Sequence, residues 1–154
     1  MPILSVTIQA QIPSSVVLAR EGPRVPVVAR VPTQLDALLR KQGNCVPAPV
    51  SGMGLIDTGA SLTMVDEAAV RQLGVSPVGE TRLGTPQGTC RSLLFPMRIS
   101  IEVPPNTPMI AAEIARVAVG PLAQQGLLCL IGRDILQHCL LVYDGLNGRF
   151  TIAI

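Results

Sequence analysis

The sequence predicts an all-β domain with a few short helices, and three observations lead to this expectation. Glycine and proline occur 14 times each, which indicates many turns between short elements rather than long helices. Segments such as residues 96–103 alternate apolar and polar side chains, as half-buried strands do. The chain of 154 residues is 48% hydrophobic but only 2% aromatic, so we expect one domain with an aliphatic core.

In the first half of the chain, apolar segments predict strands that two short helices interrupt. The predicted strands cover residues 4–12, 15–20, 25–31 and 48–56, and the first two of them are expected to form a hairpin. Residues 33–43 begin with Thr33, end with Gly43 and place leucines on one face, which predicts a helix. Residues 65–75 predict a second helix that ends at Gly74.

The second half of the chain is expected to be almost entirely β. Strands are predicted within residues 78–95, around a turn at 84–88, and within residues 96–103 and 126–136, with a loop at 104–108. Residues 139–154 predict a closing hairpin whose turn lies at 144–148. The pattern of residues 109–119 fits a helix and a strand equally well.

Charge and hydrophobicity argue against nucleic-acid and membrane partners. The net charge is +2, the arginines are scattered and never form a run, and only 2% of the residues are aromatic, whereas a nucleic-acid groove needs clustered cations and stacking platforms. No segment reaches the roughly 18 to 20 apolar residues that span a bilayer. The N-terminus has no basic leader before its apolar residues, so we expect a cytoplasmic protein.

The cysteine and histidine pattern predicts neither a metal site nor a bound cofactor. The four cysteines, Cys45, Cys90, Cys129 and Cys139, form no Cys-x-x-Cys pair and are expected to be reduced thiols. His138 is the only histidine, which leaves no zinc-ligand spacing. It is adjacent to Cys139, but neighbours in a chain rarely face each other as a nucleophile and its base must.

The strongest functional signal is Asp57, which follows the aliphatic pair Leu55 and Ile56. A carboxylate at the end of a buried strand must accept hydrogen bonds or change its pKa. Gly59 permits a tight turn, and the hydroxyl of Thr58 can hold that turn in place. Asp-Thr-Gly alone is an ordinary turn sequence, but the aliphatic pair before it, the predicted helix after it and a later aliphatic segment, "LCLIGRDIL", indicate a functional site.

Three segments in this order resemble those of the retropepsins, the retroviral and retroviral-like aspartic proteases. "LIDTGAS" (55–61) resembles their catalytic loop, and "RLGTPQGTC" (82–90) resembles their β-hairpin flap. "LIGRDIL" (130–136) resembles the apolar-Gly-Arg segment before their short C-terminal helix. The resemblance covers about two-thirds of the chain, from about Val50 onward. It implies a closed β-barrel with short helices that forms a two-fold symmetric homodimer.

The resemblance also implies roles for individual residues. Asp57 would be the catalytic acid, Thr58 would brace the two active-site loops across the dimer, and Gly59 would offer its backbone to the substrate. Ala60 completes the loop, as it does in the retroviral enzymes. Supporting residues behind the loop would be Gly132 and Arg133, and candidates for the flap are Gly84, Thr85 and Gly88.

One departure from the family pattern concerns the partner of Arg133. Retroviral members often have an acid two residues after the alanine, where it can pair with this arginine. The present chain has Leu62 at that position. We therefore expect either Asp134 or a backbone carbonyl group to bind Arg133.

A single Asp-Thr-Gly turn implies two chains. Peptide hydrolysis by this chemistry needs two carboxylates that share one proton, one to activate a water molecule and one to hydrogen-bond the scissile carbonyl. Only Asp57 lies in such a turn; Asp144 also precedes a glycine, but we interpret it as part of a hairpin turn. We expect a homodimeric aspartic endopeptidase that binds an extended polypeptide and prefers apolar side chains beside the cleaved bond.

Two other interpretations stay open at this point. The fold could serve as a dimerisation or peptide-binding module with little or no proteolysis, or the Asp-Thr-Gly turn could be incidental in a structural β domain. Residues 46–154 are expected to form the protease domain. Residues 1–45 have no counterpart in the resemblance and could add strands, a short helix or a pro-segment.

Overall fold

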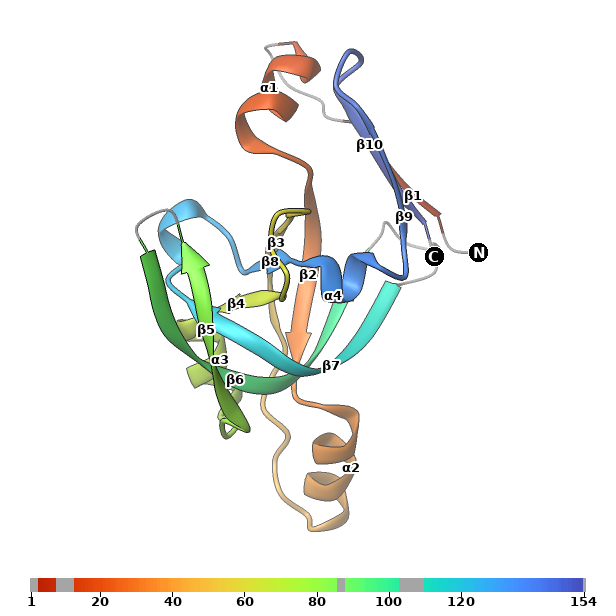
Figure 1. Cartoon of the computed structure of the whole chain (residues 1–154). Coiled ribbons are helices and arrows are strands. Elements are labelled where there is room, and N and C mark those ends of the chain that lie inside the picture. Colours follow the sequence, from red (N-terminus) through yellow and green to blue (C-terminus); the bar gives the residue numbers. More distant parts are fainter. Residues whose placement is uncertain (1–2, 8–12, 86–87, 103–109, 154) are drawn as a thin grey trace.

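The structure, a computed structural model, describes residues 3–7, 13–85, 88–102 and 110–153 (Figure 1). Strands account for 47% of it and helices for 23%, so the prediction of a mostly β protein is confirmed. The strands belong to two sheets, a large one that contains the Asp57 segment and a small one that joins the two ends of the described chain.

Seven strands of the described chain form the large sheet, in the order β2-β3-β8-β4-β7-β6-β5. Their bounds are β2 (Arg24–Arg30), β3 (Val50–Ile56), β4 (Met64–Asp66), β5 (Gly79–Thr85), β6 (Gly88–Ile101), β7 (Ile110–Gly120) and β8 (Cys129–Ile131). Because β2 also pairs with β6, six of these strands close into a ring. Strand β5 lies outside the ring, as the hairpin partner of β6.

The interior of the ring is aliphatic, as the composition predicts. Val25 and Val27 of β2 alternate with the exposed Pro26, and Met97 and Ile101 of β6 are equally buried. Burial of such side chains stabilises the fold by about 25 cal/mol per Å² of apolar surface. The ring is thus a packed core on which loops can be held in fixed positions.

Strand β6 is longer than the sequence predicted. Residues 88–95 and 96–103 were expected to be separate strands, but β6 runs without interruption to Ile101. A register shift against β7 lies between Phe95 and Met97. Pro96 stands at this point, and because proline has no N–H it cannot continue the ladder there. The result is one bent strand rather than two.

The small sheet has the order β1-β10-β9, and it also contradicts a prediction. Strand β1 (Ile3–Thr7) pairs with β10 (Arg149–Ala153), which pairs with β9 (Leu140–Asp144). The predicted hairpin partner of the first strand, residues 15–20, is instead the helix α1 (Ser14–Glu21). This helix starts directly after Pro13, and its Leu18 is completely buried. The edge of β1 that was expected to pair with residues 15–20 pairs with β10 instead. Residues 8–12 of the predicted strand lie outside the described residues.

The remaining predicted elements are present with shifted bounds. Helix α2 (Thr33–Lys41) and helix α3 (Glu67–Leu73) correspond to the two predicted helices, and Gly74 ends α3 in the left-handed conformation. Within the predicted strand at 126–136, only residues 129–131 form β8, and the last four residues are the short helix α4 (Arg133–Leu136). A 3-10 turn, η1 (Ala123–Gln125), precedes β8. Residues 109–119, for which helix and strand were both open, contribute to β7. The predicted loop at 104–108 lies outside the described residues.

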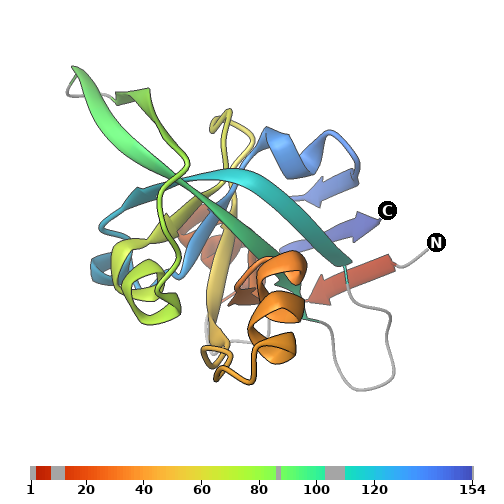
Figure 2. The same ribbon diagram turned by 90° about the horizontal axis from the view of Figure 1, so that it is seen from below.

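Different elements extend from the two ends of the ring. The β5–β6 hairpin and the loop that joins β3 to β4 extend toward the same side, the top in Figure 1, where α1 also lies. Helix α2 projects from the opposite side, toward the viewer in Figure 2. None of the helices in the described ranges has the length and apolar character needed to cross a bilayer.

Candidate active site

Asp57 lies where two parallel strands end together. Strand β3 pairs with β8 so that Ile56 is opposite Ile131, and the N–H of Asp57 donates a hydrogen bond to the carbonyl oxygen of Ile131 at 3.0 Å. Both isoleucines are buried. The backbone of Asp57 is therefore anchored to the core, while its side chain is only partly buried.

The turn after Asp57 is closed by the aspartate itself. Gly59 N–H donates to Asp57 Oδ1 at 2.9 Å, and Ala60 N–H donates to the Asp57 carbonyl oxygen at 3.2 Å. A Cβ atom at position 59 would lie 3.1 Å from Oδ1, so glycine allows this close approach. Oδ2 accepts no hydrogen bond within the described part of the chain and can bind a water molecule or a substrate.

Arg133 supports this loop from behind. Its Nη1 donates to the carbonyl oxygens of Thr58 and Gly59 at 2.7 and 2.9 Å, and its backbone N–H donates to the carbonyl oxygen of Ala60 at 2.9 Å. Charge-assisted hydrogen bonds of this kind are stronger than neutral ones. Of the two partners considered from the sequence, backbone carbonyls are the ones that bind Arg133.

Asp134 instead binds Thr63, a residue that the sequence analysis did not identify. Both carboxylate oxygens accept the N–H of Thr63, at 3.0 and 2.9 Å, and the Thr63 hydroxyl donates to Oδ1 at 2.7 Å. The same hydroxyl accepts the N–H of Gly132 at 3.1 Å. A useful signal was present in the sequence, because a threonine between Leu62 and Met64 enters the core and must find polar partners there.

Gly132 permits the close packing of the two segments. A Cβ atom at this position would lie 2.5 Å from the backbone carbonyl carbon of Leu62 and 2.8 Å from the N of Thr63. Any side chain would therefore push the Asp57 loop away from β8. Together, Gly132, Arg133 and Asp134 attach one loop to the start of α4 through backbone, guanidinium and carboxylate contacts.

A cleft of about 420 Å³ lies between the Asp57 loop and strand β5. One side consists of Asp57 and residues 59–62, the other of residues 81–84, and Met64 and Leu130 contribute to the lining. Leu62, Met64, Leu83 and Leu130 make the cleft largely apolar. Gly84, a flap candidate, lines it, whereas the backbones of Thr85 and Gly88 pair at the end of the hairpin. Thr58 is exposed and does not line the cleft.

Among the described residues that line the cleft, Asp57 is the only acid. The other aspartates are engaged elsewhere. Asp36 pairs with Arg40, and Asp66 accepts N–H bonds from Ala68, Leu122 and Ala123. Asp144 lies in the β9–β10 turn, as expected, and hydrogen bonds from Asn147, followed by Arg149, lower its pKa. The described chain therefore brings no second carboxylate to Asp57.

Alternative chemistry finds little support. The thiol of Cys139 has a raised pKa because it is partly buried, and its Sγ contacts the carbonyl oxygen of Ile135 rather than His138. A raised pKa disfavours the nucleophilic thiolate. Within the described ranges, no three His, Cys, Asp or Glu side chains are grouped so that they could hold a metal ion.

The site thus consists of one partly exposed carboxylate on an anchored loop. It faces a cleft that has both apolar and polar lining residues, Arg82 among them, and whose far wall is strand β5. Comparison of this chain with protein-family models and with curated protein sequences gives no match. Its function therefore has to be inferred from the site itself.

Proposed function

We propose that this protein is an aspartic endopeptidase of the retropepsin type, active as a homodimer in which two Asp57 carboxylates share one proton. The observation that carries this proposal is the isolation of Asp57. Among the described residues that line the cleft it is the only acid, Arg133 holds its loop in place, and its Oδ2 accepts no hydrogen bond within the described chain. A two-fold axis beside Asp57 would bring its symmetry mate to it, because such an interface is isologous.

The chemistry follows from two carboxylates in close contact. Two like charges this close do not both ionise readily, so the pair holds one proton near neutral or mildly acid pH. The ionised carboxylate takes a proton from a water molecule, whose oxygen attacks the carbonyl carbon of the peptide. The protonated carboxylate hydrogen-bonds the carbonyl oxygen. Proton transfer to the peptide nitrogen then breaks the C–N bond and restores the shared proton.

The architecture of the cleft suits an extended peptide. Strand β5 is the last strand of the large sheet, and its outer edge pairs with no other strand in the described chain. A substrate can add to this edge through backbone hydrogen bonds while its side chains enter apolar pockets. Leu62 and Leu83, on opposite walls, favour apolar side chains next to the cleaved bond.

The decisive experiment compares Asp57→Asn with Asp36→Asn. Both replace one carboxylate by an amide, but Asp36 lies on α2 and pairs with Arg40, outside the cleft. With a library of apolar peptides at mildly acidic pH, we expect Asp57→Asn to lose activity by roughly 10²- to 10⁴-fold and Asp36→Asn to keep it. Equal cleavage by Asp57→Asn and the native protein would refute the proposal.

Mixing the two proteins tests the shared site. Native chains are allowed to exchange with an equal amount of Asp57→Asn chains. Half of the native chains then lie in mixed dimers, which contain one Asp57 instead of two, so activity per native chain should fall to about one half. A site within one chain would show no change. A peptide-binding module without proteolysis, the alternative interpretation, would bind the same peptides with and without Asp57 and cleave none of them.

A further inference from the structure

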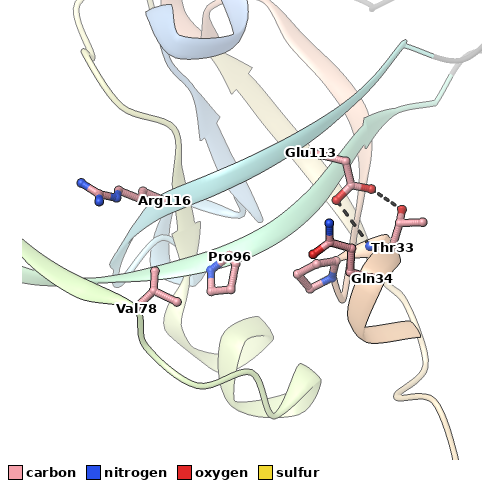
Figure 3. A pocket seen from close by; sticks show the side chains of 7 residues that line it. Thr33, Gln34, Val78, Pro96, Glu113 and Arg116 are labelled. Atoms are coloured by element: carbon pink, nitrogen blue, oxygen red, sulfur yellow. Dashed lines mark hydrogen bonds between the residues drawn. The ribbon is translucent and has the colours of Figure 1, made fainter. Parts of the chain in front are cut away.

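A second, larger cavity lies on a different part of the molecule. Its volume is about 740 Å³, and none of the described residues that line it also lines the Asp57 cleft. Figure 3 shows its lining side chains. We call it the α2 groove, because its lining joins the start of α2 to strands β6 and β7. The described residues that line it are Pro32, Thr33, Gln34, Val78, Pro96, Glu113 and Arg116.

The walls of the α2 groove are apolar and stiff. Pro32 and Pro96 have rings that fix their backbone conformation, and Val78 is 54% exposed although it is aliphatic. A cavity between roughly 300 and 1,000 Å³ with such walls and a few polar groups is typical of ligand sites. The size and lining of this groove fall within that class.

The acid in the groove is already neutralised. The carboxylate of Glu113 accepts hydrogen bonds from the N–H, at 3.4 Å, and from the hydroxyl of Thr33, and it lies 3.6 Å from Nε of Arg98. Figure 3 shows Glu113 turned toward Thr33 at one end of the groove. Glu113 is therefore engaged with the start of α2 and offers little free negative charge to a ligand.

The cation in the groove is not neutralised. Arg116 comes from the same strand as Glu113 but lies at the other end of the groove (Figure 3). Its side chain is exposed and forms no ion pair with any acid of the described chain. The side-chain amide of Gln34 forms no hydrogen bond within the described chain, so it can both donate to and accept from a peptide group. The groove thus combines one free positive charge, one free amide and apolar walls.

We propose that the α2 groove binds the C-terminal end of a short apolar peptide. The terminal carboxylate would pair with Arg116, which can hold it through two parallel hydrogen bonds. The last apolar side chain would lie against Val78 and Pro96, and the amide of Gln34 would bind a peptide group. Charge complementarity selects an anionic end, and the free amide favours a peptide over a simple fatty carboxylate.

The test measures binding of a fluorescein-labelled Gly-Ala-Leu peptide with a free C-terminus and of the same peptide with a C-terminal amide. The Asp57→Asn protein is used, so that the result does not depend on proteolysis. We expect the amide form to bind about tenfold more weakly. Arg116→Gln should weaken the free acid by the same factor and leave the amide form unchanged. Arg20→Gln, an exposed arginine of α1 outside both cavities, is the matched control and should change neither.

Equal binding of the acid and the amide, no binding of either, or an unchanged affinity in Arg116→Gln would overturn the proposal. Octanoate is the competitor that tests whether a simple carboxylate binds as well as the peptide. If octanoate displaces the peptide at the concentration at which the unlabelled peptide does, the ligand class is wrong. Because Arg116 is exposed, its variant should fold, and an unchanged melting temperature verifies this.

Discussion

Replacing Thr63 by valine tests whether the loop that carries Asp57 depends on a buried hydrogen-bond network. Thr63 is completely buried, and its hydroxyl both donates to Asp134 and accepts the N–H of Gly132. Valine has nearly the same shape but no hydroxyl. The variant therefore removes two hydrogen bonds without opening a cavity.

The magnitude follows from what is left unpaired. The N–H of Gly132 is buried, and leaving it unsatisfied costs about 1–3 kcal/mol. Oδ1 of Asp134 loses its hydroxyl donor but keeps the N–H groups of Thr63 and Ile135, so this part of the loss is smaller. We expect Thr63→Val to lower the free energy of unfolding by about 3 kcal/mol. Thr63→Ser keeps the hydroxyl and loses one buried methyl group, which costs about 1 kcal/mol.

Urea denaturation of the two variants measures this difference directly. If Thr63→Val is as stable as Thr63→Ser, the hydroxyl contributes nothing and the network has no structural role. Hydrogen exchange of the backbone amides of Gly59 and Ala60 measures the local stability of the loop. Both N–H groups close the Asp57 turn, and they should exchange faster in Thr63→Val than in Thr63→Ser because the loop has lost its attachment to Gly132.

Three further predictions concern Gly132 and Cys129, two positions whose environment allows little change. Gly132→Ala should lower the free energy of unfolding by about 1–3 kcal/mol in urea denaturation, because its Cβ would meet the backbone of Leu62; stability equal to that of the native protein would contradict the packing. Burial raises the pKa of the Cys129 thiol from 9.0 to about 12, so iodoacetamide at pH 8 should modify the exposed Cys45 and Cys90 of the folded protein and spare Cys129. Since the unfolded thiol ionises near pH 9 while the folded one stays protonated, Cys129 should make stability fall between pH 9 and about 12. A Cys129→Ala variant without that loss would confirm its origin.

Local patterns predicted the elements that local chemistry determines. Thr33 is the first residue of α2, but it does not cap the helix, because Pro32 is the N-cap and the Thr33 hydroxyl donates to Glu113. The aliphatic run before Asp57 is a strand, Gly74 marks a helix end, and the Asp144 turn joins two strands. In each case the residues that specify the element lie within or next to it. Position 57 could be identified as a candidate functional site, because an acid directly after a buried strand conflicts with the apolar pattern around it.

Contacts between distant segments could not be predicted in this way. Residues 15–20 were predicted as the strand that pairs with β1, but they belong to a helix. The partner of β1 is β10, where Ser5 and Thr151 share a hydrogen bond at 2.6 Å across 146 positions. The same limit explains why Thr63 was missed, since its partner Asp134 lies 71 positions away. Periodicity describes which face of a segment is buried, but it does not identify the segment that covers it.

In the proposed mechanism, loop order depends on one chain and activity depends on two, and this difference can be measured. Within the described chain, the contacts that hold the Asp57 loop come from β8, Gly132, Arg133 and the Thr63–Asp134 pair. In the proposed mechanism, only the shared proton requires a second copy. Dilution below the dissociation constant of the dimer should therefore lower the activity per chain while the loop stays ordered. Activity per chain should then fall in proportion to concentration, because the fraction of dimers does, whereas amide exchange at Gly59 should not change. Constant activity per chain in samples that sedimentation identifies as monomers would mean that one Asp57 suffices, and the shared-proton mechanism would be wrong.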